Sequence, residues 1–281
     1  MNALPHRVLA PSARADIGAV HPPGHGPRAY CVDCAWYAKC VVASLPARHA
    51  LPLITRMTFP ARQTLCQEGD AFSSVYVIRS GTLKSLITSE DGRQQIVAIH
   101  LPAETIGTES IATGRRSRTV IAVERSEVCV IGFAGLNRLM HEIPAARRWF
   151  QQTLSDEMAR SGETACRLRS TSAEARLASF LLDLSRRLSA STEATPEFTL
   201  SPSRVDIAIH LGLTRETVSR AFAKLRRLHL IEGGLTRVRL CDPLQLGNLA
   251  ACRVGEGARA QRDTAAELRR NTAHQPSCAG P

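Results

Sequence analysis

The chain has 281 residues, of which 44% are hydrophobic, 22% are charged and 4% are aromatic, and its formal net charge is +11. This composition predicts a globular protein of about two domains, and no apolar run approaches the roughly 20 residues that a membrane helix needs. The basic balance favours a polyanionic partner such as nucleic acid, while the scarcity of aromatic residues argues against single-strand binding, which depends on base stacking. The N-terminal sequence lacks the apolar core of a signal peptide, so we expect a cytoplasmic protein.

Residues 1–30 are rich in Pro, Gly, His and Arg without periodicity, and we expect them to form a flexible arm. The segment CVDCAWYAKC follows and places Cys31, Cys34 and Cys40 within ten positions. In a reducing compartment such a cluster indicates a metal or redox site and not disulfides. Three thiolates this close repel one another unless a cation neutralises them, so a short loop and a fourth ligand from elsewhere could enclose one metal centre. We interpret the other isolated cysteines as packing or incidental residues, namely Cys66, Cys166, Cys241, Cys252 and Cys278.

From about residue 51 to residue 135 the sequence is typical of β-structure. The stretch SSVYVIRSGTLKSLITSEDGRQQIVAIHL contains short alternating or β-branched runs. They are interrupted at Ser80-Gly81 and at Asp91-Gly92, and an Asp-Gly pair is typical of hairpin turns. Many short strands with glycine turns predict a barrel, a roll or a sandwich.

A long helix is predicted from Pro144 onward, because AARRWFQQTLSDEMARSGETACRLRS has no proline and a single glycine. Apolar or small side chains recur at intervals of three and four residues and therefore share one face. This stripe consists of Phe150, Leu154, Met158, Ser161, Ala165 and Leu168. Because the stripe is narrow and the opposite face is charged, we expect it to pair with a second copy of the chain. Packing onto the protein's own β domain is the alternative.

A second α-rich unit is expected from Ser172 to Asp242, and its segment SPSRVDIAIHLGLTRETVSRAFAKLRRLHLIE predicts two helices around a short turn. Ser203 and Thr214 are typical N-caps, and Gly212 ends the first helix because that position favours a residue that tolerates positive φ. The outward face of the second helix carries side chains that can read base edges. These candidates are Arg215, Glu216, Ser219 and Arg220. The following GGLTRVRL predicts a two-stranded wing.

The order of arm, β domain, long helix and winged helix-turn-helix resembles the CRP/FNR family of bacterial transcription regulators. The segments VYVIRSGTLK, ERSEVCVIGF and LGLTRETVSRAFAKL are similar to its β-roll and recognition-helix segments. The resemblance covers roughly residues 31 to 250 and implies an α+β fold with a cyclic-nucleotide-binding-like β-roll, a long dimerisation helix and a C-terminal winged helix-turn-helix. It also implies a homodimer on palindromic double-stranded DNA. The corresponding boundaries are 1–30 for the arm, 31–143 for the cysteine segment and β-roll, 144–171 for the dimerisation helix, 172–243 for the DNA-binding domain and 244–281 for a tail.

The C-x2-C-x5-C spacing of Cys31, Cys34 and Cys40 resembles that of FNR, the oxygen-responsive branch of this family. In that branch a fourth ligand lies in a segment similar to ERSEVCVIGF, where this chain has Cys129. The resemblance implies one 4Fe–4S cluster per subunit on these four cysteines, with dimerisation and DNA binding under low oxygen. Zinc on the same thiols, and three unliganded thiols in a flexible arm, are the alternatives.

A cyclic nucleotide is the alternative effector. The segment IGTESIATGRRSRTVIA partly resembles the family's phosphate-binding cassette, with Gly107, Glu109, Arg116 and Ser117. An arginine in such a cassette would pair with a cyclic phosphate. Here the glutamate is displaced from the usual Gly-Glu-Leu arrangement and the leucine is missing, so we favour the cluster.

The recognition helix matches the FNR pattern at Glu216, Ser219 and Arg220, which implies half-sites similar to TTGAT. Arg215 is instead similar to the version in the cyclic-AMP receptor, so we expect an altered preference at the outermost base. Ser161 stands where the FNR branch can carry an acidic residue that opposes pairing. We therefore expect this chain to dimerise more readily.

The resemblance also implies a contact with RNA polymerase, for which the loop around Ser89–Gly92 is the candidate, and activation or repression of anaerobic genes. The sequence contains no nucleophile–base set, no phosphate loop and no catalytic metal motif such as H-E-x-x-H. We therefore expect a regulator and not an enzyme.

Overall fold

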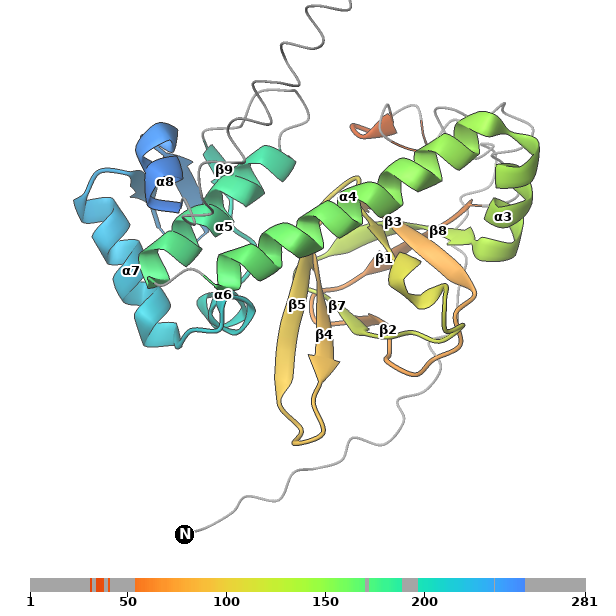
Figure 1. Ribbon diagram of the computed structural model, residues 1–281, viewed down its shortest axis with the longest axis horizontal. Coiled ribbons are helices and arrows are strands. Elements are labelled where there is room, and N and C mark those ends of the chain that lie inside the picture. Colours follow the sequence, from red (N-terminus) through yellow and green to blue (C-terminus); the bar gives the residue numbers. More distant parts are fainter. Residues whose placement is uncertain are drawn as a thin grey trace, which may run out of the picture.

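The computed structural model describes residues 31, 34–37, 40, 54–169, 172–188, 197–234 and 236–250. These residues form two lobes, which the long helix α4 (Pro144–Leu168) connects (Figure 1). The first lobe is rich in β-structure, and the second is a smaller helical unit that begins with α5 (Ala173–Leu188). The predicted arm, residues 1–30, and the predicted tail beyond residue 250 lie outside the described residues. None of the helices in these ranges combines the length and the apolar character that a bilayer crossing requires.

Two antiparallel sheets make up the described part of the β-rich lobe, with the strand orders β1-β8-β3-β6 and β2-β7-β4-β5. The first sheet contains β1 (Ile54–Phe59), β3 (Ser74–Ser80), β6 (Thr105–Ile106) and β8 (Ser126–Gly132). The second contains β2 (Thr64–Cys66), β4 (Leu83–Thr88), β5 (Gln94–His100) and β7 (Thr119–Ala122).

The core of this lobe lies between the two sheets. It includes Ile78, Leu83, Ile106 and Val128, which are at most 1% exposed. The expected hairpin joins β4 to β5, and Gly92 at its turn has a φ of +77°, a conformation that glycine adopts without a steric cost.

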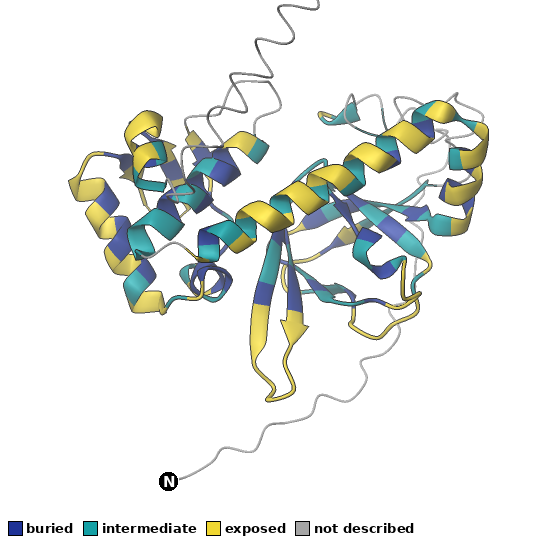
Figure 2. Ribbon diagram, viewed as in Figure 1, coloured by how far each residue is buried: buried dark blue, intermediate teal, exposed yellow. Residues whose placement is uncertain are grey.

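Helix α3 (Phe133–Glu142) follows β8 directly and leads into α4. The backbone is extended at Ile143, and Pro144 occupies the first turn of α4, where the N–H that proline lacks has no helical partner in any case. The N-terminal part of α4 buries Ala146 and Phe150 against the β-rich lobe. Much of the remaining surface of α4 is exposed (Figure 2).

The C-terminal lobe is built from α5, α6 (Arg204–Leu211), α7 (Arg215–Arg227), α8 (Pro243–Ala250) and a small sheet. The sheet has the order β10-β11-β9, with β9 (Glu197–Thr199), β10 (Ile231–Gly233) and β11 (Arg237–Leu240). Apolar residues three and four positions apart on α5 pack against the inward faces of α6 and α7. The shared core includes Leu177, Phe180, Leu181, Ile207, Leu211, Val218, Phe222 and Leu225.

The predicted α+β fold is confirmed, with its β-roll, long helix and winged helix-turn-helix. The structure adds three elements to the sequence analysis. The wing has a third strand, because β9 pairs with β11, and α3 lies between the β-roll and the long helix. Helix α8 occupies residues for which the sequence predicts no structure, and its Leu246 is fully buried.

Candidate metal centre and nucleic-acid interface

The clustered cysteines lie on a succession of tight turns. The Cys34 N–H donates to the Cys31 carbonyl at 3.0 Å, the Tyr37 N–H donates to the Cys34 carbonyl at 2.9 Å, and the Cys40 N–H donates to the Tyr37 carbonyl at 3.0 Å. Hydrogen bonds between residues three positions apart bring the side chains of those residues to one side of the segment. The spacing of the three cysteines therefore places their side chains on the same side of the segment.

Cys129 comes from a different part of the chain. It lies on β8, where it pairs with Arg56 on β1 and with Val77 on β3. Because β8 is hydrogen-bonded along both edges, the backbone of Cys129 is held firmly within the sheet. The β-rich lobe thus presents one thiol from a rigid strand to the segment that carries the other three.

The four cysteines line one small cavity with a volume of about 20 Å³. Its other lining residues are Trp36, Tyr37, Val77, Ile78, Arg79 and Ala103. The structure therefore brings Cys31, Cys34, Cys40 and Cys129 together, although 89 positions separate Cys40 from Cys129 in the sequence.

Burial and mutual repulsion disfavour the thiolate forms in this cavity. The pKa of Cys129 is raised to about 12, chiefly by burial and then by repulsion from Cys40, Cys31 and Cys34, while Arg56 opposes the shift. The pKa of Cys31 is also raised, first by burial and then by Cys34. Because the thiolate is the form that binds metals, these sulfur atoms ionise together only when a cation offsets their repulsion.

Four cysteine sulfurs are a suitable donor set for an iron–sulfur cluster or for zinc. In the described part of the chain, no three His, Cys, Asp or Glu side chains stand in an arrangement ready to hold a metal ion. A cavity of about 20 Å³ is close to the volume that one water molecule requires.

The cysteine segment and α4 share one apolar cluster. Cys31, Tyr37, Cys40 and Cys129 pack against a group of buried residues that includes Phe150 of α4. Trp149 and Leu154, also on α4, pack against the same group. The position of the cysteine segment is therefore mechanically linked to the N-terminal part of the long helix.

The helix-turn-helix is capped as its sequence predicts. The Ser203 hydroxyl accepts the Asp206 N–H at 3.1 Å, and the Asp206 carboxylate accepts the Ser203 N–H at 3.1 Å, which together form a capping box. Gly212 follows α6 with a φ of +62°, and the Thr214 hydroxyl accepts the Thr217 N–H at the start of α7. The turn and both caps fix the orientation of α7 relative to α6.

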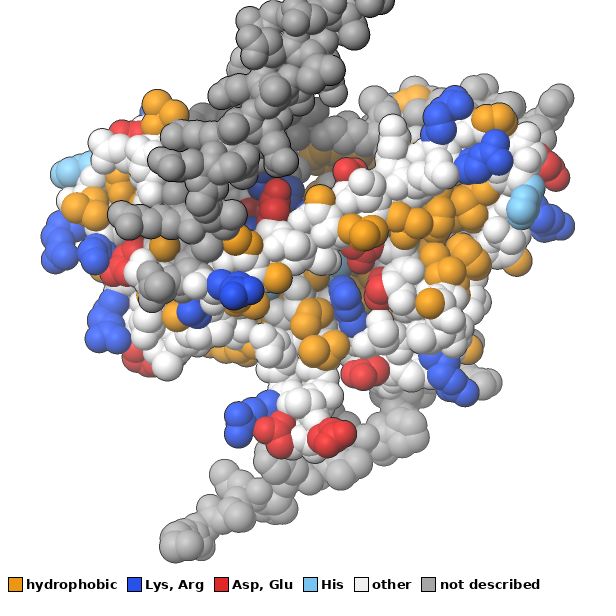
Figure 3. Space-filling model, viewed as in Figure 1, with side chains coloured by type: hydrophobic (Ala, Val, Ile, Leu, Met, Phe, Trp, Pro, Cys, Tyr) orange, Lys and Arg blue, Asp and Glu red, His pale blue; other side chains and the backbone are white. Residues whose placement is uncertain are grey.

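The recognition face of α7 is open to a ligand. The four predicted readers, Arg215, Glu216, Ser219 and Arg220, are all exposed, whereas Val218, Phe222 and Leu225 are buried. Lys and Arg side chains gather over this outer edge of the C-terminal lobe (Figure 3). An exposed helix with basic and hydrogen-bonding side chains on one face can enter the major groove of DNA.

Arg204, at the start of α6, is a functional candidate that the sequence analysis did not identify. Its guanidinium carbon lies 3.2 Å from the centre of the Phe222 ring, and its Nη1 is buried without a hydrogen-bond partner among the described residues. Burial and the nearby Arg226 lower its pKa to about 10. Arg204 and Arg226 donate to the carbonyls of Gly234 and Gly233 at 3.3 and 3.4 Å, and two guanidinium groups at this foot of the wing suit a phosphate of the DNA backbone. The sequence gives no signal for this site, because Arg204 and Arg226 lie on different helices and come together only in the folded protein.

Arg237 and Arg239 on β11 of the wing are exposed, but both are paired. Arg237 lies 3.4 Å from Glu197, and Arg239 lies 3.8 Å from Glu232. Surface ion pairs of this kind contribute little to stability, so both arginines can exchange these partners for phosphates at a small cost.

The residues of the partial cassette are engaged within the β-rich lobe. Arg116 is 4% exposed, its Nη2 donates to the Ser74 carbonyl at 2.7 Å, and its guanidinium lies over the rings of Phe72 and Tyr76. A carbon atom added at Gly107 would come within 2.4 Å of Arg116 Nη1, which has no hydrogen-bond partner among the described residues. The Glu109 carboxylate accepts the Gly107 N–H, and the Ser117 N–H donates to Ser110.

The predicted dimer stripe divides into two parts along α4. Phe150 is buried within its own subunit, and Leu154 packs at the edge of the same cluster. Met158 is 76% exposed, and Ser161 and Ala165 are exposed as well, whereas Leu168 is half-buried. Hydrophobic side chains gather along this face of the molecule (Figure 3).

Residues 56–142 match the cyclic nucleotide-binding domain, and residues 175–249 match the Crp-like helix-turn-helix domain. The chain is 35% identical over 227 residues to the transcriptional activator protein Anr of Pseudomonas protegens, a match that covers 79% of this chain and 93% of that protein. It is also 35% identical to the anaerobic regulatory protein of Haemophilus influenzae, over 72% of this chain and 80% of that protein. Among solved structures, FixK2 from Bradyrhizobium japonicum is similar with a TM-score of 0.64 and 27% identity, over 71% of this chain and 98% of that one.

Proposed function

The chain belongs to the CRP/FNR family of bacterial transcription regulators, which are not enzymes, and from that premise we propose that it is an oxygen-responsive member with a 4Fe–4S cluster on Cys31, Cys34, Cys40 and Cys129. The observation that carries this proposal is the cavity that these four cysteines share. The relatives named as Anr and as an anaerobic regulatory protein support the same branch of the family.

The residues of this chain couple such a site to the long helix. When bound, a 4Fe–4S cluster supplies cationic iron that stabilises four thiolates and an oxygen-labile connection between the cysteine segment and β8. Cys31 and Cys40 then hold the segment against the apolar cluster that contains Phe150. Loss of this connection would cost the dimer as much stability as the connection had provided, and the subunits would then release DNA.

The dimer uses α4, with Met158, Ser161 and Ala165 as the exposed part of its interface. A two-fold axis through paired α4 helices presents two recognition helices to a palindrome on double-stranded DNA. Each recognition helix reads a half-site similar to TTGAT. The reading residues are Arg215, Glu216, Ser219 and Arg220.

The hairpin tip between β4 and β5 is the proposed contact with RNA polymerase. Residues 88–95 are exposed, and the Ser89 hydroxyl lies 2.5 Å from the Asp91 carboxylate and 3.0 Å from the Arg93 carbonyl, to either of which its single hydrogen can be donated. These bonds give a protruding loop a defined shape, as a protein contact requires. We place the protein in the cytoplasm, where it activates or represses anaerobic genes according to promoter geometry.

The two alternatives are zinc on the same four cysteines and a cyclic nucleotide beside Arg116. Four cysteine thiolates bind zinc as readily as they bind an iron–sulfur cluster, but zinc would not form a connection that oxygen can break. A cyclic nucleotide would need Arg116 for its phosphate, and this guanidinium already donates to the Ser74 carbonyl and lies over two aromatic rings. Arg116 Nη2 and the faces of the guanidinium are thus engaged within the lobe, while Nη1 has no partner among the described residues; on these contacts we favour the cluster over the nucleotide.

We predict that Cys129→Ser abolishes the difference in DNA binding between anaerobic and air-exposed protein. Serine removes one of four thiolate ligands, so the connection between the cysteine segment and β8 cannot form. DNA affinity measured by fluorescence anisotropy under nitrogen and in air gives the comparison. Cys166→Ser, on α4 outside the cavity, is the control and should keep the full difference. An equal loss in both variants would contradict the ligand assignment.

A further inference from the structure

The loop between β5 and β6 is a tight turn formed by Leu101, Pro102, Ala103 and Glu104. The Glu104 N–H donates to the Leu101 carbonyl at 3.2 Å, and the Glu104 carboxylate accepts the Leu101 N–H at 3.1 Å. Ala103, in the third position, has a φ of +72°, where glycine is the usual residue. Two backbone hydrogen bonds with Ile78 on β3, of 2.8 and 3.0 Å, hold the turn in this strained conformation. The turn is thus rigidly attached to the first sheet.

One end of this turn reaches the cysteine cavity. Ala103 lines that cavity together with the four cysteines and with Ile78, the residue to which the turn is hydrogen-bonded. Ala103 also lines a larger adjoining cavity of about 680 Å³, along with Trp36 and Cys40. A movement of the cysteine segment therefore changes the surroundings of Ala103 directly.

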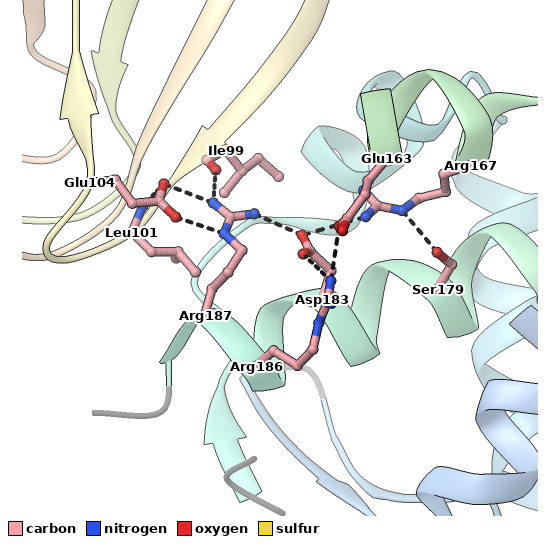
Figure 4. A network of polar contacts seen from close by, with 9 residues as sticks. All are labelled: Ile99, Leu101, Glu104, Glu163, Arg167, Ser179, Asp183, Arg186 and Arg187. Atoms are coloured by element: carbon pink, nitrogen blue, oxygen red, sulfur yellow. Dashed lines mark hydrogen bonds and ion pairs between the residues drawn. The ribbon is translucent and has the colours of Figure 1, made fainter. Parts of the chain in front are cut away.

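The other end of the turn holds the C-terminal lobe. Both oxygens of Glu104 accept hydrogen bonds from Arg187 on α5, at 2.7 and 2.9 Å, and Arg187 also donates to the Ile99 carbonyl (Figure 4). The side chains of Glu104 and Arg187 are only 10% and 17% exposed. A paired, two-point contact of this kind fixes orientation as well as distance.

Arg187 continues into a network that includes α4. Arg187 Nη1 lies 2.9 Å from Asp183, which also lies 3.4 Å from the 3% exposed Arg167 of α4 (Figure 4). Arg186 joins Asp183 to Glu163 at the exposed end. Three arginines thus face three carboxylates, and Asp183 contacts all three arginines, so the loss of one carboxylate leaves the positive charges less fully compensated. The network ties β-roll, long helix and DNA-binding lobe together at one point.

We infer that the turn Leu101–Glu104 couples the occupancy of the cysteine cavity to the position of the DNA-binding lobe within a single subunit, through the contact of Glu104 with Arg187. This inference rests on the proposed function, and it adds an intrasubunit route to the dimer equilibrium. Glu104 and Arg187 are positioning residues, since neither lies on the recognition face. Because coupling between sites is reciprocal, DNA should also favour retention of the cluster.

Amide hydrogen exchange under nitrogen, on iron-loaded and cluster-free protein, tests this coupling without a DNA-binding assay. In the wild type we expect loading to slow exchange in the cysteine segment, and in α5 by about fivefold or more. In Glu104→Gln, which keeps the shape of the side chain and removes its charge, the slowing in the cysteine segment should remain and that in α5 should be lost. Sedimentation checks that both proteins have the same dimer fraction.

Two further variants sharpen the result. Glu163→Gln removes the exposed carboxylate of the same network and should leave the slowing in α5 intact, because its ion pair is about half exposed. The double variant Glu104→Gln with Arg187→Gln leaves no unpaired buried charge and should fold while behaving like Glu104→Gln. Slowing in α5 that persists in both Glu104 variants, or that is absent from the loaded wild type, would overturn the inference. Protein that binds no iron would instead overturn the proposed function, and the inference with it.

Discussion

The proposed roles of individual side chains depend on their exposure. A side chain that contacts DNA must be exposed, whereas a cysteine that binds a metal centre in the cavity is enclosed. Arg220 extends from α7 into solvent, with a weak 3.4 Å contact to Thr217 as its anchor, so it is free to meet a base edge. Cys129 is enclosed, and its raised pKa makes it a poor thiolate until a cation is bound. The proposed reading and sensing roles thus use opposite environments, one exposed and one enclosed, which the two lobes provide.

We predict that Arg220→Ala weakens binding to the specific site by about 1–3 kcal/mol and relaxes discrimination at one base pair, because the side chain reads a base edge. Arg227→Ala is the matched change near the end of the same helix, where an exposed arginine suits a phosphate. It should weaken binding to all sequences alike. Binding measured on the palindrome and on single-base variants separates the two effects, and unchanged discrimination in Arg220→Ala would refute its reading role.

Among the elements, α4 serves two partners along its length. Its first turns contribute Ala146 and Phe150 to the core of their own subunit, while Met158 is largely exposed. The two interpretations of the apolar stripe, packing on the β domain and pairing with a second copy, therefore apply to different parts of the same helix. Packing on the β-roll accounts for the N-terminal part, and the proposed dimer accounts for the exposed part.

We predict different consequences for substitutions at the two ends of this stripe. Met158→Glu should weaken dimerisation with little effect on the stability of the subunit, because the side chain is exposed and a charge opposes pairing. Phe150→Ala should destabilise the subunit itself by about 3–5 kcal/mol, because it leaves a cavity in the core. Sedimentation and thermal denaturation measure the two quantities. Normal dimerisation of Met158→Glu would remove this part of α4 from the interface.

The sequence predicts an element well where a local rule determines it. The Asp91-Gly92 turn, the caps at Ser203 and Thr214 and the glycine at 212 have short-range signals, and the structure confirms them. Strand β9 has three residues, too few for a periodic pattern, and its pairing with β11 is decided by tertiary contacts.

The candidate site was predictable only in part, and for the same reason. The spacing of Cys31, Cys34 and Cys40 is local, but Cys129 could be assigned only through the resemblance to a family. The contact between Glu104 and Arg187 joins residues 83 positions apart, and the proximity of Arg204 to Arg226 joins two helices. No rule of composition or periodicity indicates such long-range pairs.

On the scale of the whole molecule, polar contacts hold the two lobes together. Lys84 on β4 lies 2.6 Å from Asp206, the residue that also closes the capping box of α6. His210 on α6 lies 3.1 Å from the Ile96 carbonyl of β5, whereas His100 and Ser85, 2.7 Å apart, both belong to the β-rich lobe. The orientation of the recognition helix thus depends on buried groups that belong to both lobes.

We predict that the protein loses stability as the pH falls below about 6.5. Burial, the largest cause in both cases, lowers the pKa of His100 to about 3 and that of His210 to about 4. In the unfolded chain both take up a proton near pH 6.5, so unfolding binds protons between that pH and about 4. The free energy of unfolding should fall by at most about 1.4 kcal/mol per pH unit for each histidine.

Urea denaturation of cluster-free protein at pH 7.5 and 5.5 checks this slope, in a range above the usual titration of carboxylates. His210→Asn keeps a donor for the Ile96 carbonyl and cannot be protonated, so it should make the dependence on pH shallower. An identical slope in His210→Asn and the wild type would show that His210 does not contribute.

The iron and sulfide content of protein isolated under nitrogen tests the central claim most directly. If the cysteines that line the cavity hold a 4Fe–4S cluster, each chain should contain about four irons and four sulfides, and its visible absorbance should bleach in air. Colourless protein with stoichiometric zinc, or protein without metal, would contradict the claim.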